Sequence, residues 1–398
     1  MSHPGSAFEG PLAGFKILEI AGVGPTQFAG MLMADLGAEV VRVDRLHTAD
    51  LGIPIPPRYN LMNRSRASVA VDLKSDEGVE VILKLCEGAD ALFEGFRPGV
   101  MERLGLAPDV CMDRNPRLVY GRMTGWGQSG PLAQAAGHDP NYLAVAGVLG
   151  ALEGPNNAPA TPLNLIGDGG GALYLVMGLL AALLETSRSG RGQVVDAAIS
   201  DSSASLMTLY YGLLGAGLWR DRRGENLFDG AAPFLRSYRT LDGEYIVVAA
   251  LEDRFYGELL DELGLDAEWA EGRMDPARWP AISERLAEVI ATKTRAEWVA
   301  IMEGKDSCVS PVLSLTEALA HPHNQARGTF TEFDGIPQPA VAPRFDRTPG
   351  AIASAPAAPG ENTRSVLTSW GFEHDTIADL ETRGVVGQSP QPPDPKKA

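Results

Sequence analysis

The chain has 398 residues, with 34 Lys and Arg against 51 Asp and Glu, so its formal net charge is −17 with histidine counted as neutral. A strongly acidic chain repels a phosphate backbone, which argues against nucleic-acid binding. Hydrophobic residues make up 44% and charged residues 21%, which excludes disorder of the whole chain. The length suggests about two domains.

The chain contains three cysteines, Cys86, Cys111 and Cys308, and no pair has C-x-x-C spacing. This pattern indicates neither a disulfide framework nor a zinc knuckle, and it is typical of a reducing compartment. The N-terminus lacks the basic and apolar regions of a signal peptide, and the longest apolar stretch, residues 169–184, is shorter than a membrane span. We therefore expect a cytoplasmic protein without a membrane partner.

Strand and helix patterns alternate through the first 125 residues. Residues 15–20 predict a buried strand, residues 25–36 a helix, and residues 39–44 a second strand. The alternation continues through three further strands and one helix, at residues 68–72, 90–94, 118–122 and 76–86. A repeated β-α-β pattern predicts an α/β fold with a mostly parallel, doubly wound sheet.

A long loop follows, because residues 125–164 lose this periodicity apart from an apolar piece at 142–152. Loops of this length are often functional. Gly167-Asp168-Gly169-Gly170-Gly171 then begins an apolar helix that continues to about residue 186. A strand and another helix are predicted after it, at residues 193–199 and 200–219.

The composition changes after residue 219. A hairpin with Asp242-Gly243 at its turn is predicted at residues 238–248, followed by helices at 253–263, 280–293 and 295–302. Beyond residue 327 the chain is rich in Pro and Ala, which indicates an extended return segment with one helix near 375–383. We expect a large domain at 1–215, a smaller α/β domain at 216–327 and a return of residues 328–398 to the large domain.

Two motifs that suggest cofactors have simpler explanations. Gly22-Val-Gly24-Pro25 begins like a dinucleotide-binding turn, but the third glycine is missing and Pro25 has no backbone N–H for a phosphate. His321 and His323 flank a proline, which is typical of a helix end, and the other histidines stand singly. We predict neither a metal site nor a bound cofactor.

The most informative residues are His138 and Asp168. His138 lies in the loop sequence Gly137-His-Asp-Pro-Asn-Tyr142, and Asp168 precedes three glycines. A histidine and a carboxylate suit acid–base chemistry, although an aspartate before a helix is also a favoured N-cap. The glycines favour a ligand site, because they weaken the helix and leave the backbone N–H groups of Gly169 and Gly170 open.

These motifs belong to a series of short sequences that runs through most of the chain. The series comprises residues 11–14, 35–38, 41–45, 63–64, 72–74, 94–99, 125–131, 137–142, 167–168, 190–193, 229–234, 306–312 and 321–328. In this order it resembles the family III CoA-transferases, and within them the α-methylacyl-CoA racemase branch.

The resemblance implies a catalytic set. In the transferases the aspartate that matches Asp168 is a nucleophile that forms an acyl-enzyme anhydride, and the histidine of Gly-His-Asp is typically absent. In the racemases that histidine and aspartate flank the α-carbon of the thioester, and a glutamate of the small domain, matched by Glu252, orients the histidine. Because His138, Asp168 and Glu252 are all present, the resemblance favours a racemase of 2-methylacyl-CoA thioesters.

The chemistry of such a reaction explains these residue types. Inversion of a carbon next to a thioester removes a weakly acidic proton from one face and returns a proton to the other. His138 and Asp168 would exchange these roles with the direction of the reaction. We expect the N–H groups of Gly169 and Gly170 to stabilise the enolate oxygen, and burial to raise the pKa of Asp168.

The CoA thioester is the substrate, so no separate cofactor is implied, but its phosphates require basic groups on this acidic chain. The basic candidates in the sequence are Arg45, Arg64, Lys74, Arg97 and Arg103. The resemblance implies CoA contacts at Val23, Leu73 and several of these basic residues, and thioester contacts in the two loops. We expect the substrate-binding residues to be Val23, Arg45, Leu73, Lys74, Arg97, Arg103, Gly137, Asp139, Tyr142 and Asn164.

The resemblance also implies an assembly. Members of this family form interlocked homodimers in which the chain ends belong to a Rossmann-like large domain and the small domain reaches across the partner. In that arrangement Glu252 would approach His138 of the other subunit, and activity would depend on dimerisation.

Two alternative functions stay open. One is a CoA-transferase that moves CoA between carboxylic acids with Asp168 as the nucleophile, and the other is a noncatalytic acyl-CoA-binding protein. The sequence does not identify the acyl group, so short, branched fatty and bile-acid-like thioesters are all compatible with it.

Overall fold

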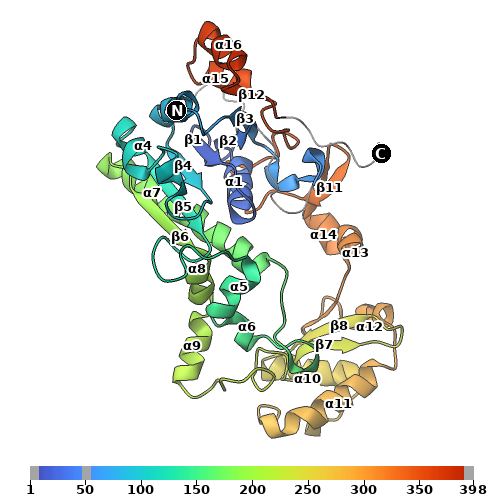
Figure 1. Ribbon diagram of the computed structural model, residues 1–398. Helices are drawn as coiled ribbons and strands as arrows, with labels where there is room; N and C mark the ends of the chain where they lie inside the picture. The colour runs from blue at the N-terminus through green and yellow to red at the C-terminus, as the bar shows by residue number, and fades with distance from the viewer. Residues whose placement is uncertain (1–8, 47–54, 390–398) are drawn as a thin grey trace. The chain divides into compact units, whose positions relative to one another are not determined.

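The computed structural model describes residues 9–46 and 55–389 (Figure 1). The chain divides into two compact units. The first unit comprises the residues up to 146, residues 162–205 and the residues from 328 onward, and the second comprises residues 147–161 and 206–327.

The first unit is built on a seven-stranded sheet with the strand order β12-β3-β2-β1-β4-β5-β6. The strands are β1 (Lys16–Ile20), β2 (Glu39–Arg45), β3 (Ala67–Val71), β4 (Ala91–Glu94), β5 (Val119–Thr124), β6 (Val194–Ala198) and β12 (Val386–Gly387). All pairs are parallel except β12 with β3. The chain order reverses between β1 and β4, and in open parallel sheets ligands bind outside the carboxyl ends of the strands at such a point.

Helices cover both faces of this sheet, as the β-α-β pattern requires. One face packs against α2, α4, α15 and α16, and Ile82, Leu85 and Leu367 are buried there. The other face packs against α1 and α7, where Met33 and Leu175 are fully buried. The helices of this unit are α1 (Pro25–Asp35), α2 (Asp76–Glu87), α3 (Val100–Arg103), α4 (Pro108–Arg114), α5 (Asp139–Val145), α7 (Gly170–Ser189), α8 (Ile199–Leu206), α15 (Thr363–Ser369) and α16 (His374–Thr382).

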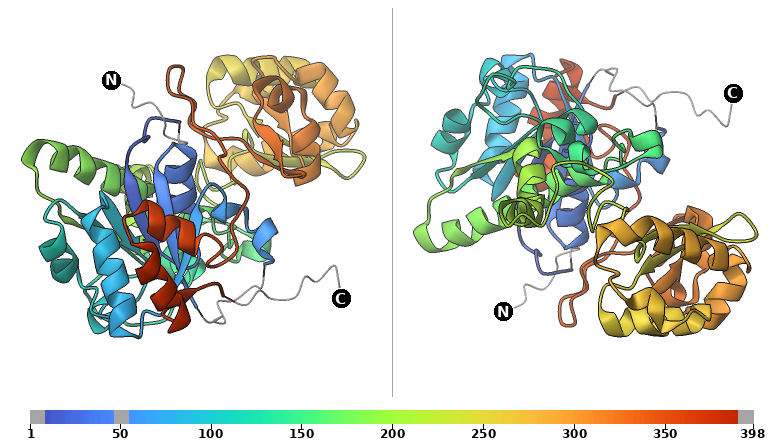
Figure 2. Two further views of the ribbon diagram at one scale, coloured as in Figure 1. Left: turned by 90° about the horizontal axis from the view of Figure 1, so that it is seen from above. Right: turned by 90° about the horizontal axis from the view of Figure 1, so that it is seen from below.

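The C-terminal segment completes the first unit by long-range hydrogen bonds. The hairpin β10 (Phe330–Phe333) and β11 (Ile336–Pro339) is followed by extended chain, and then by α15, which lies beside β3 (Figure 2). The Asn362 side chain accepts the Ser68 N–H at 3.0 Å, and Thr363 Oγ1 accepts the Ala70 N–H at 3.1 Å. These contacts attach the return segment to the edge of the sheet.

The apolar helix after Asp168 is longer than the sequence predicted. Helical structure covers Leu165–Ser189, 25 residues that include an 18-residue stretch with a mean hydropathy of 1.6, so this helix is long and apolar enough to cross a membrane by length and composition. The expectation of a segment too short for a membrane span was therefore wrong for the whole helix, because the π-turn extends it backward and α7 continues to Ser189. The inner face of α7 packs against β5, β6 and α1, which is typical of a core helix.

The second unit contains a three-stranded antiparallel sheet of β7 (Leu235–Arg239), β8 (Tyr245–Ala249) and β9 (Val309–Pro311). The predicted hairpin is present, and Gly243 adopts the positive φ of +85° that its turn requires. Phe234, Tyr256 and Trp298 lie in a separate hydrophobic core. The helices of this unit are α6 (Val148–Ala151), α9 (Thr208–Gly215), α10 (Asp253–Leu263), α11 (Trp279–Ile290), α12 (Arg295–Met302), α13 (Leu315–Ala320) and α14 (Pro322–Arg327).

Two expectations about the middle of the chain differ from the structure. The helix predicted at 200–219 is two helices, α8 and α9, which are interrupted at Met207. The second unit begins at residue 206 instead of 216, and it also includes residues 147–161. The inserted segment belongs there because Arg223 Nε donates to the Asn157 carbonyl at 2.9 Å and Gly224 leaves room for the Glu153 carboxylate.

Candidate active site

The sequence-predicted substrate residues follow the carboxyl ends of neighbouring strands. Parallel strands end at one edge of a sheet, so these residues share one edge of the first unit. Val23 follows β1, Arg45 ends β2, Leu73 and Lys74 follow β3, Arg97 and Arg103 follow β4, and the loop with Gly137 follows β5. The point where the strand order reverses lies among them.

Exposed basic side chains cluster at this edge. Arg45, Lys74, Arg97 and Arg103 are all exposed. The Arg45 guanidinium lies 5.8 Å from the centre of the ring of Phe96, the residue that precedes Arg97 in the chain. These groups are available to an anionic ligand in a way that a buried, paired guanidinium is not.

Arg64, by contrast, is not available to a phosphate. It is buried, and its guanidinium donates to the Asp35 carboxylate at 2.6 Å, to Gln338 Oε1 at 2.8 Å and to the Pro339 carbonyl at 2.9 Å. Among the five basic candidates, Arg64 is therefore excluded as a phosphate-binding group, because long-range packing uses its donors.

A buried carboxylate organises the loop that carries Arg97. Glu94 Oε2 accepts the Phe96 N–H at 2.6 Å, and Glu94 Oε1 accepts from Arg122 Nε at 3.1 Å. Burial raises the pKa of Glu94 to about 7, although the Phe96 N–H and Arg122 both lower it. Glu94 was not among the predicted site residues, and its position as the last residue of a fully buried strand was the signal available in the sequence.

Asp168 lies inside a π-turn, Leu165–Gly169, and not at the N-cap of α7. The Gly169 N–H donates to the Asn164 carbonyl at 3.1 Å, and the Gly170 N–H donates to carbonyls within the same turn. Both N–H groups are therefore engaged. The expectation that Gly169 and Gly170 form an oxyanion site was wrong, because the helical hydrogen bonding begins five residues earlier than the glycines suggested.

The His138 loop is supported by a buried tyrosine. His138 precedes α5, its N–H donates to Asn141 Oδ1 at 3.0 Å, and its side chain is exposed. The Tyr142 hydroxyl donates to the Gly137 carbonyl, and its ring packs edge-on against Trp126 at 4.8 Å. A Cβ at Gly125 would lie 2.0 Å from the Tyr142 ring, which explains the glycine there.

The Asp139 side chain connects the loop that carries His138 to the turn that carries Asp168. Its Oδ2 accepts the backbone N–H of Asp168 at 2.8 Å, and the residue is only 4% exposed. A Cβ at Gly167 would lie 2.4 Å from this carboxylate, so the close approach requires glycine. The prediction that Asp139 contacts the substrate was wrong, because its side chain turns inward and holds the Asp168 backbone.

The surroundings of Asp168 favour its protonated form. Burial raises the pKa of this carboxyl, the hydrogen bond from Asn164 Nδ2 at 3.2 Å lowers it, the Asp139 carboxylate raises it, and His138 lowers it. The Asp168 N–H donates to Asp139, the residue after His138, so the segments that carry His138 and Asp168, 30 positions apart, are brought together. Asn164 lies beside the Asp168 carboxylate.

Gly24 was missed as a contributor to this site. It adopts a positive φ of +68° before α1, and a Cβ there would lie 3.0 Å from Asp168 Oδ2. A side chain at position 24 would therefore crowd the carboxylate. The sequence Gly24-Pro25 marked a turn, but only the structure shows what the turn faces.

Glu252 lies in the second unit, directly before α10. It is exposed, and its carbonyl accepts the Tyr256 N–H at 2.9 Å at the first turn of that helix. Its backbone is extended, with φ −77° and ψ 149°. The Glu252 carboxylate is therefore exposed at the start of α10.

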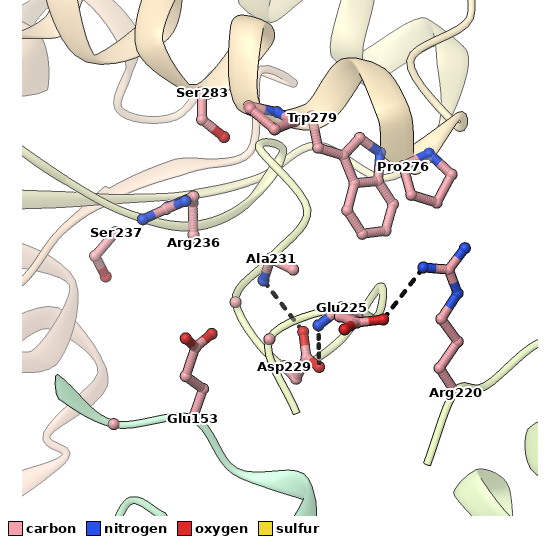
Figure 3. A pocket seen from close by; sticks show the side chains of 14 residues that line it. Glu153, Arg220, Glu225, Asp229, Ala231, Arg236, Ser237, Pro276, Trp279 and Ser283 are labelled. Carbon is pink, nitrogen blue, oxygen red and sulfur yellow. Dashed lines mark hydrogen bonds and ion pairs between the residues drawn. The ribbon is translucent and has the colours of Figure 1, made fainter. Parts of the chain in front are cut away.

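The second unit also contains a cavity of about 790 Å³ that includes none of the predicted site residues (Figure 3). Arg220 and Glu225 form an ion pair at 3.2 Å on its wall. Asp229 accepts the Ala231 N–H at 3.2 Å and stabilises the adjoining loop. In residues 9–46 and 55–389 no group of three or more potential metal ligands is clustered, in this cavity or elsewhere.

The fold and the site define a class of protein. It is an α/β protein whose parallel sheet carries basic, histidine and carboxylate groups near the point where the strand order reverses. The sequence model of CoA-transferase family III matches residues 12–363, and the chain belongs to that family. The α-methylacyl-CoA racemases of Mus musculus and Homo sapiens are 44% and 40% identical to it, each covering 94% of this chain and 97% of the relative.

Solved structures share the fold. A CAIB/BAIF family protein from Brucella suis has a TM-score of 0.77 at 25% identity, and the match covers 91% of this chain and 100% of that one. A hypothetical protein from Mycobacterium tuberculosis has a TM-score of 0.76 at 28% identity, covering 90% and 99%.

Proposed function

We infer that this chain catalyses the racemisation of 2-methylacyl-CoA thioesters. The racemase relatives are 40–44% identical to this chain, whereas succinyl-CoA–L-malate CoA-transferase subunits of Chloroflexus aurantiacus, which match a similar share of it, are 28–29% identical. The observation in the structure that carries the inference is the hydrogen bond from the Asp168 N–H to Asp139 Oδ2, which holds the half-buried Asp168 against the loop of His138.

We propose the following proton transfers. One of the two groups removes the α-proton, and the electron pair of the C–H bond moves into the enolate of the thioester. The conjugate acid of the other group then protonates the α-carbon from the opposite face. The raised pKa of Asp168 supports this role, because a carboxyl that holds its proton more tightly is a better acid–base partner for a carbon acid.

The remaining groups have supporting roles in this proposal. Asn164 orients the Asp168 carboxylate, Tyr142 supports the His138 loop, and Glu252 orients the histidine. Arg45, Lys74, Arg97 and Arg103 bind the CoA phosphates, with Val23 and Leu73 against the nucleotide part of CoA. No separate cofactor takes part, since the two bases are supplied by the chain and the thioester stabilises the enolate.

We propose a homodimer whose large unit is Rossmann-like. An apolar stripe on the outer face of α7 supports this, because Leu173, Met177 and Leu184 are each more than half exposed on one side of the helix. Contiguous exposed apolar surface of this kind is typical of interaction sites. The unpaired cysteines support a reducing, cytoplasmic location.

The test uses one enantiomer of a 2-methylacyl-CoA in D₂O, with α-deuterium incorporation and configuration followed together, and a parallel sample containing succinate or acetate as acceptor. We expect exchange with inversion and no new thioester. His138→Ala and Asp168→Ala should each lower the exchange rate by roughly 10²–10⁴-fold while the fold is retained.

Three outcomes would contradict this function. Acceptor-dependent thioester formation without α-exchange would identify a CoA-transferase with Asp168 as the nucleophile. Binding of the thioester with neither reaction, across short, branched and steroid-like acyl groups, would identify a noncatalytic binding protein. Undiminished exchange in both variants would remove His138 and Asp168 from the mechanism.

A further inference from the structure

The Glu252 carboxylate has no partner of its own in the part of the chain that the structure describes. The residue lies in a turn of residues 250–252, between the end of β8 and the start of α10. Residue 252 makes no hydrogen bond of a β-ladder there. A side chain in such a turn orients a histidine only if the backbone that carries it is held. The groups that hold this backbone therefore decide where the carboxylate points.

Arg273 bonds to the residue on each side of Glu252. Its Nη2 donates to the Leu251 carbonyl at 2.7 Å and to Asp253 Oδ1 at 2.5 Å. One guanidinium nitrogen thus joins the two neighbours of Glu252, from a position more than twenty residues further along the chain. The contact is made within the second unit, so it does not depend on another part of the protein.

Arg273 is itself rigidly placed. The guanidinium lies 4.8 Å from the centre of the Phe234 ring and 5.1 Å from that of Tyr256, both of which belong to the core of the unit. The Arg273 carbonyl accepts the Trp279 indole N–H at 2.8 Å. A planar guanidinium packed against two rings that also contact each other has few orientations, so its donors are fixed toward residues 251 and 253.

The arrangement is costly as a purely structural device. The Arg273 side chain is 6% exposed, whereas its partner Asp253 is 97% exposed. Burial of a cation against a carboxylate that stays in water gives little net stabilisation, and an apolar side chain would fill the same space beside the rings. A requirement for a fixed position of Glu252 explains why a buried arginine bonds to both of its neighbours.

We propose that Arg273 is a positioning residue for the proton-transfer step: it fixes the turn at residues 251–253 so that the Glu252 carboxylate is aimed to orient the catalytic histidine. This proposal rests on the proposed function, in which Glu252 orients His138. Arg273 touches neither the substrate nor the reacting atoms. Its loss acts on the chemical step, because CoA binds at the sheet edge of the first unit.

The experiment measures α-proton exchange in D₂O for Arg273→Met, which fills the space without charge, Arg273→Lys and Glu252→Ala, together with the double variant Arg273→Met/Glu252→Ala. The matched control is Arg254→Met, which removes an exposed arginine of α10 that pairs with Asp306 and Glu258. We expect Arg273→Met to lower kcat 10- to 100-fold with KM changed less than twofold. Arg273→Lys should restore part of this loss, and the control should keep the wild-type rate.

The double variant separates positioning from general stabilisation. If Arg273 acts through Glu252, Arg273→Met causes no further loss once Glu252 is alanine. Additive losses, or a wild-type kcat in Arg273→Met, would overturn the proposal. A wild-type rate in Glu252→Ala would instead show that the proposed role of Glu252 is wrong, while exchange by the wild type itself tests the proposed function separately.

A second variant covers the case in which Arg273→Met does not fold. Asp253→Ala removes one of the two contacts from a side chain that is almost fully exposed, so the fold is expected to survive. We expect a several-fold lower kcat with KM unchanged, and no further loss when Asp253→Ala is combined with Glu252→Ala. A wild-type kcat in Asp253→Ala, or an additive loss in the double variant, would contradict the proposal.

Discussion

The two units hold their candidate catalytic groups in different ways. In the first unit, buried side chains support both loops from beneath, with Asp139 on the Asp168 backbone and Tyr142 on the Gly137 carbonyl. In the second unit, Glu252 is exposed and its turn is held by one buried arginine. The comparison shows that a preorganised position does not require a buried catalytic group, only a buried group that fixes the backbone.

The difference also has an electrostatic side. Burial raises the pKa of Asp168, as a group that exchanges protons with carbon requires. Glu252 lies in water and serves only to orient another residue in our proposal, for which an ionised carboxylate is sufficient. The burial of each group thus matches its role.

Among the side chains of the first unit that support His138 and Asp168, the largest effect on activity should come from Asp139, which holds the Asp168 backbone. Asp139→Ala leaves the Asp168 N–H without an acceptor in a buried place, which costs about 1–3 kcal/mol and corresponds to roughly a 10- to 100-fold lower kcat. The exposed Asp109→Ala is the control. Asp139→Asn keeps an acceptor but removes the charge that raises the pKa of Asp168, so the acid limb of its pH–rate profile should move to lower pH. An unmoved limb would contradict this electrostatic coupling.

A pH-dependent stability should distinguish the buried Glu94 from its exposed neighbour Glu102. The pKa of Glu94 is about 7 in the folded chain against 4.5 as the ordinary value, so the folded state binds more protons between these pH values. Stability from this group is present below pH 4.5 and is lost as the pH rises toward 7, by up to roughly 3 kcal/mol. Chemical denaturation between pH 5 and pH 8 should therefore show a smaller decrease in Glu94→Gln than in the wild type.

Glu102→Gln provides the opposite sign. Arg122 lowers the pKa of Glu102, so this carboxylate contributes stability above its ordinary pKa and loses it as the pH falls. The Glu102→Gln variant should keep the wild-type decrease between pH 5 and pH 8. Equal pH dependence in Glu94→Gln and the wild type would show that the buried carboxyl does not retain its proton.

A smaller effect is expected from the tyrosine beneath the His138 loop. Tyr142→Phe removes the hydrogen bond to the Gly137 carbonyl and should cost about 1 kcal/mol of stability together with a several-fold lower kcat. Tyr120→Phe is a matched control, because its hydroxyl donates to the Leu106 carbonyl at 2.8 Å away from the catalytic loops. It should lose similar stability and no activity. Equal kcat losses in the two variants would indicate a general structural effect.

The smallest effect should come from Asn164. Its hydrogen bond lowers the pKa of Asp168, so Asn164→Ala should raise that pKa and move the acid limb of the pH–rate profile to higher pH, opposite to Asp139→Asn. The displacement should be less than about one pH unit, since the bond at 3.2 Å lies on the exposed side of the carboxylate. A displacement in the same direction as Asp139→Asn would mean that neither group acts on Asp168 as the structure indicates.

Much of the first unit was predictable because its signals are local. Buried strands such as 16–20 and 39–45 appear as continuous apolar runs, and α1 begins at a proline and ends before a glycine. Short motifs also marked the candidate catalytic pair, because His138 lies in a loop motif and Asp168 precedes three glycines. Gly24 and Arg273 gave no comparable signal, and Glu94 was marked only by its place at the end of a buried strand.

The errors arose where hydrogen bonding is not encoded locally. A π-turn has no distinct composition, so Asp168 was placed before the helix, with an N-cap as its alternative role, and Gly169 and Gly170 were expected to be free donors. Asp139 and Arg64 are polar residues with the composition of surface groups, yet both are buried against partners at least 29 positions away. Sequence patterns depend on residues that are close along the chain, so they do not reveal hydrogen bonds between distant residues.

The sequence by itself determined the alternation of strands and helices, the family and the chemical types of the catalytic pair, because apolar periodicity and short motifs depend on adjacent residues. The tertiary structure decided which donors are free, which carboxylates are buried and which arginine holds Glu252. Those properties depend on burial and on hydrogen bonds between distant segments, such as Arg273 with Leu251 and Asp139 with Asp168. Desolvation and long-range pairing set the energy of a polar group, and both exist only after the chain has folded.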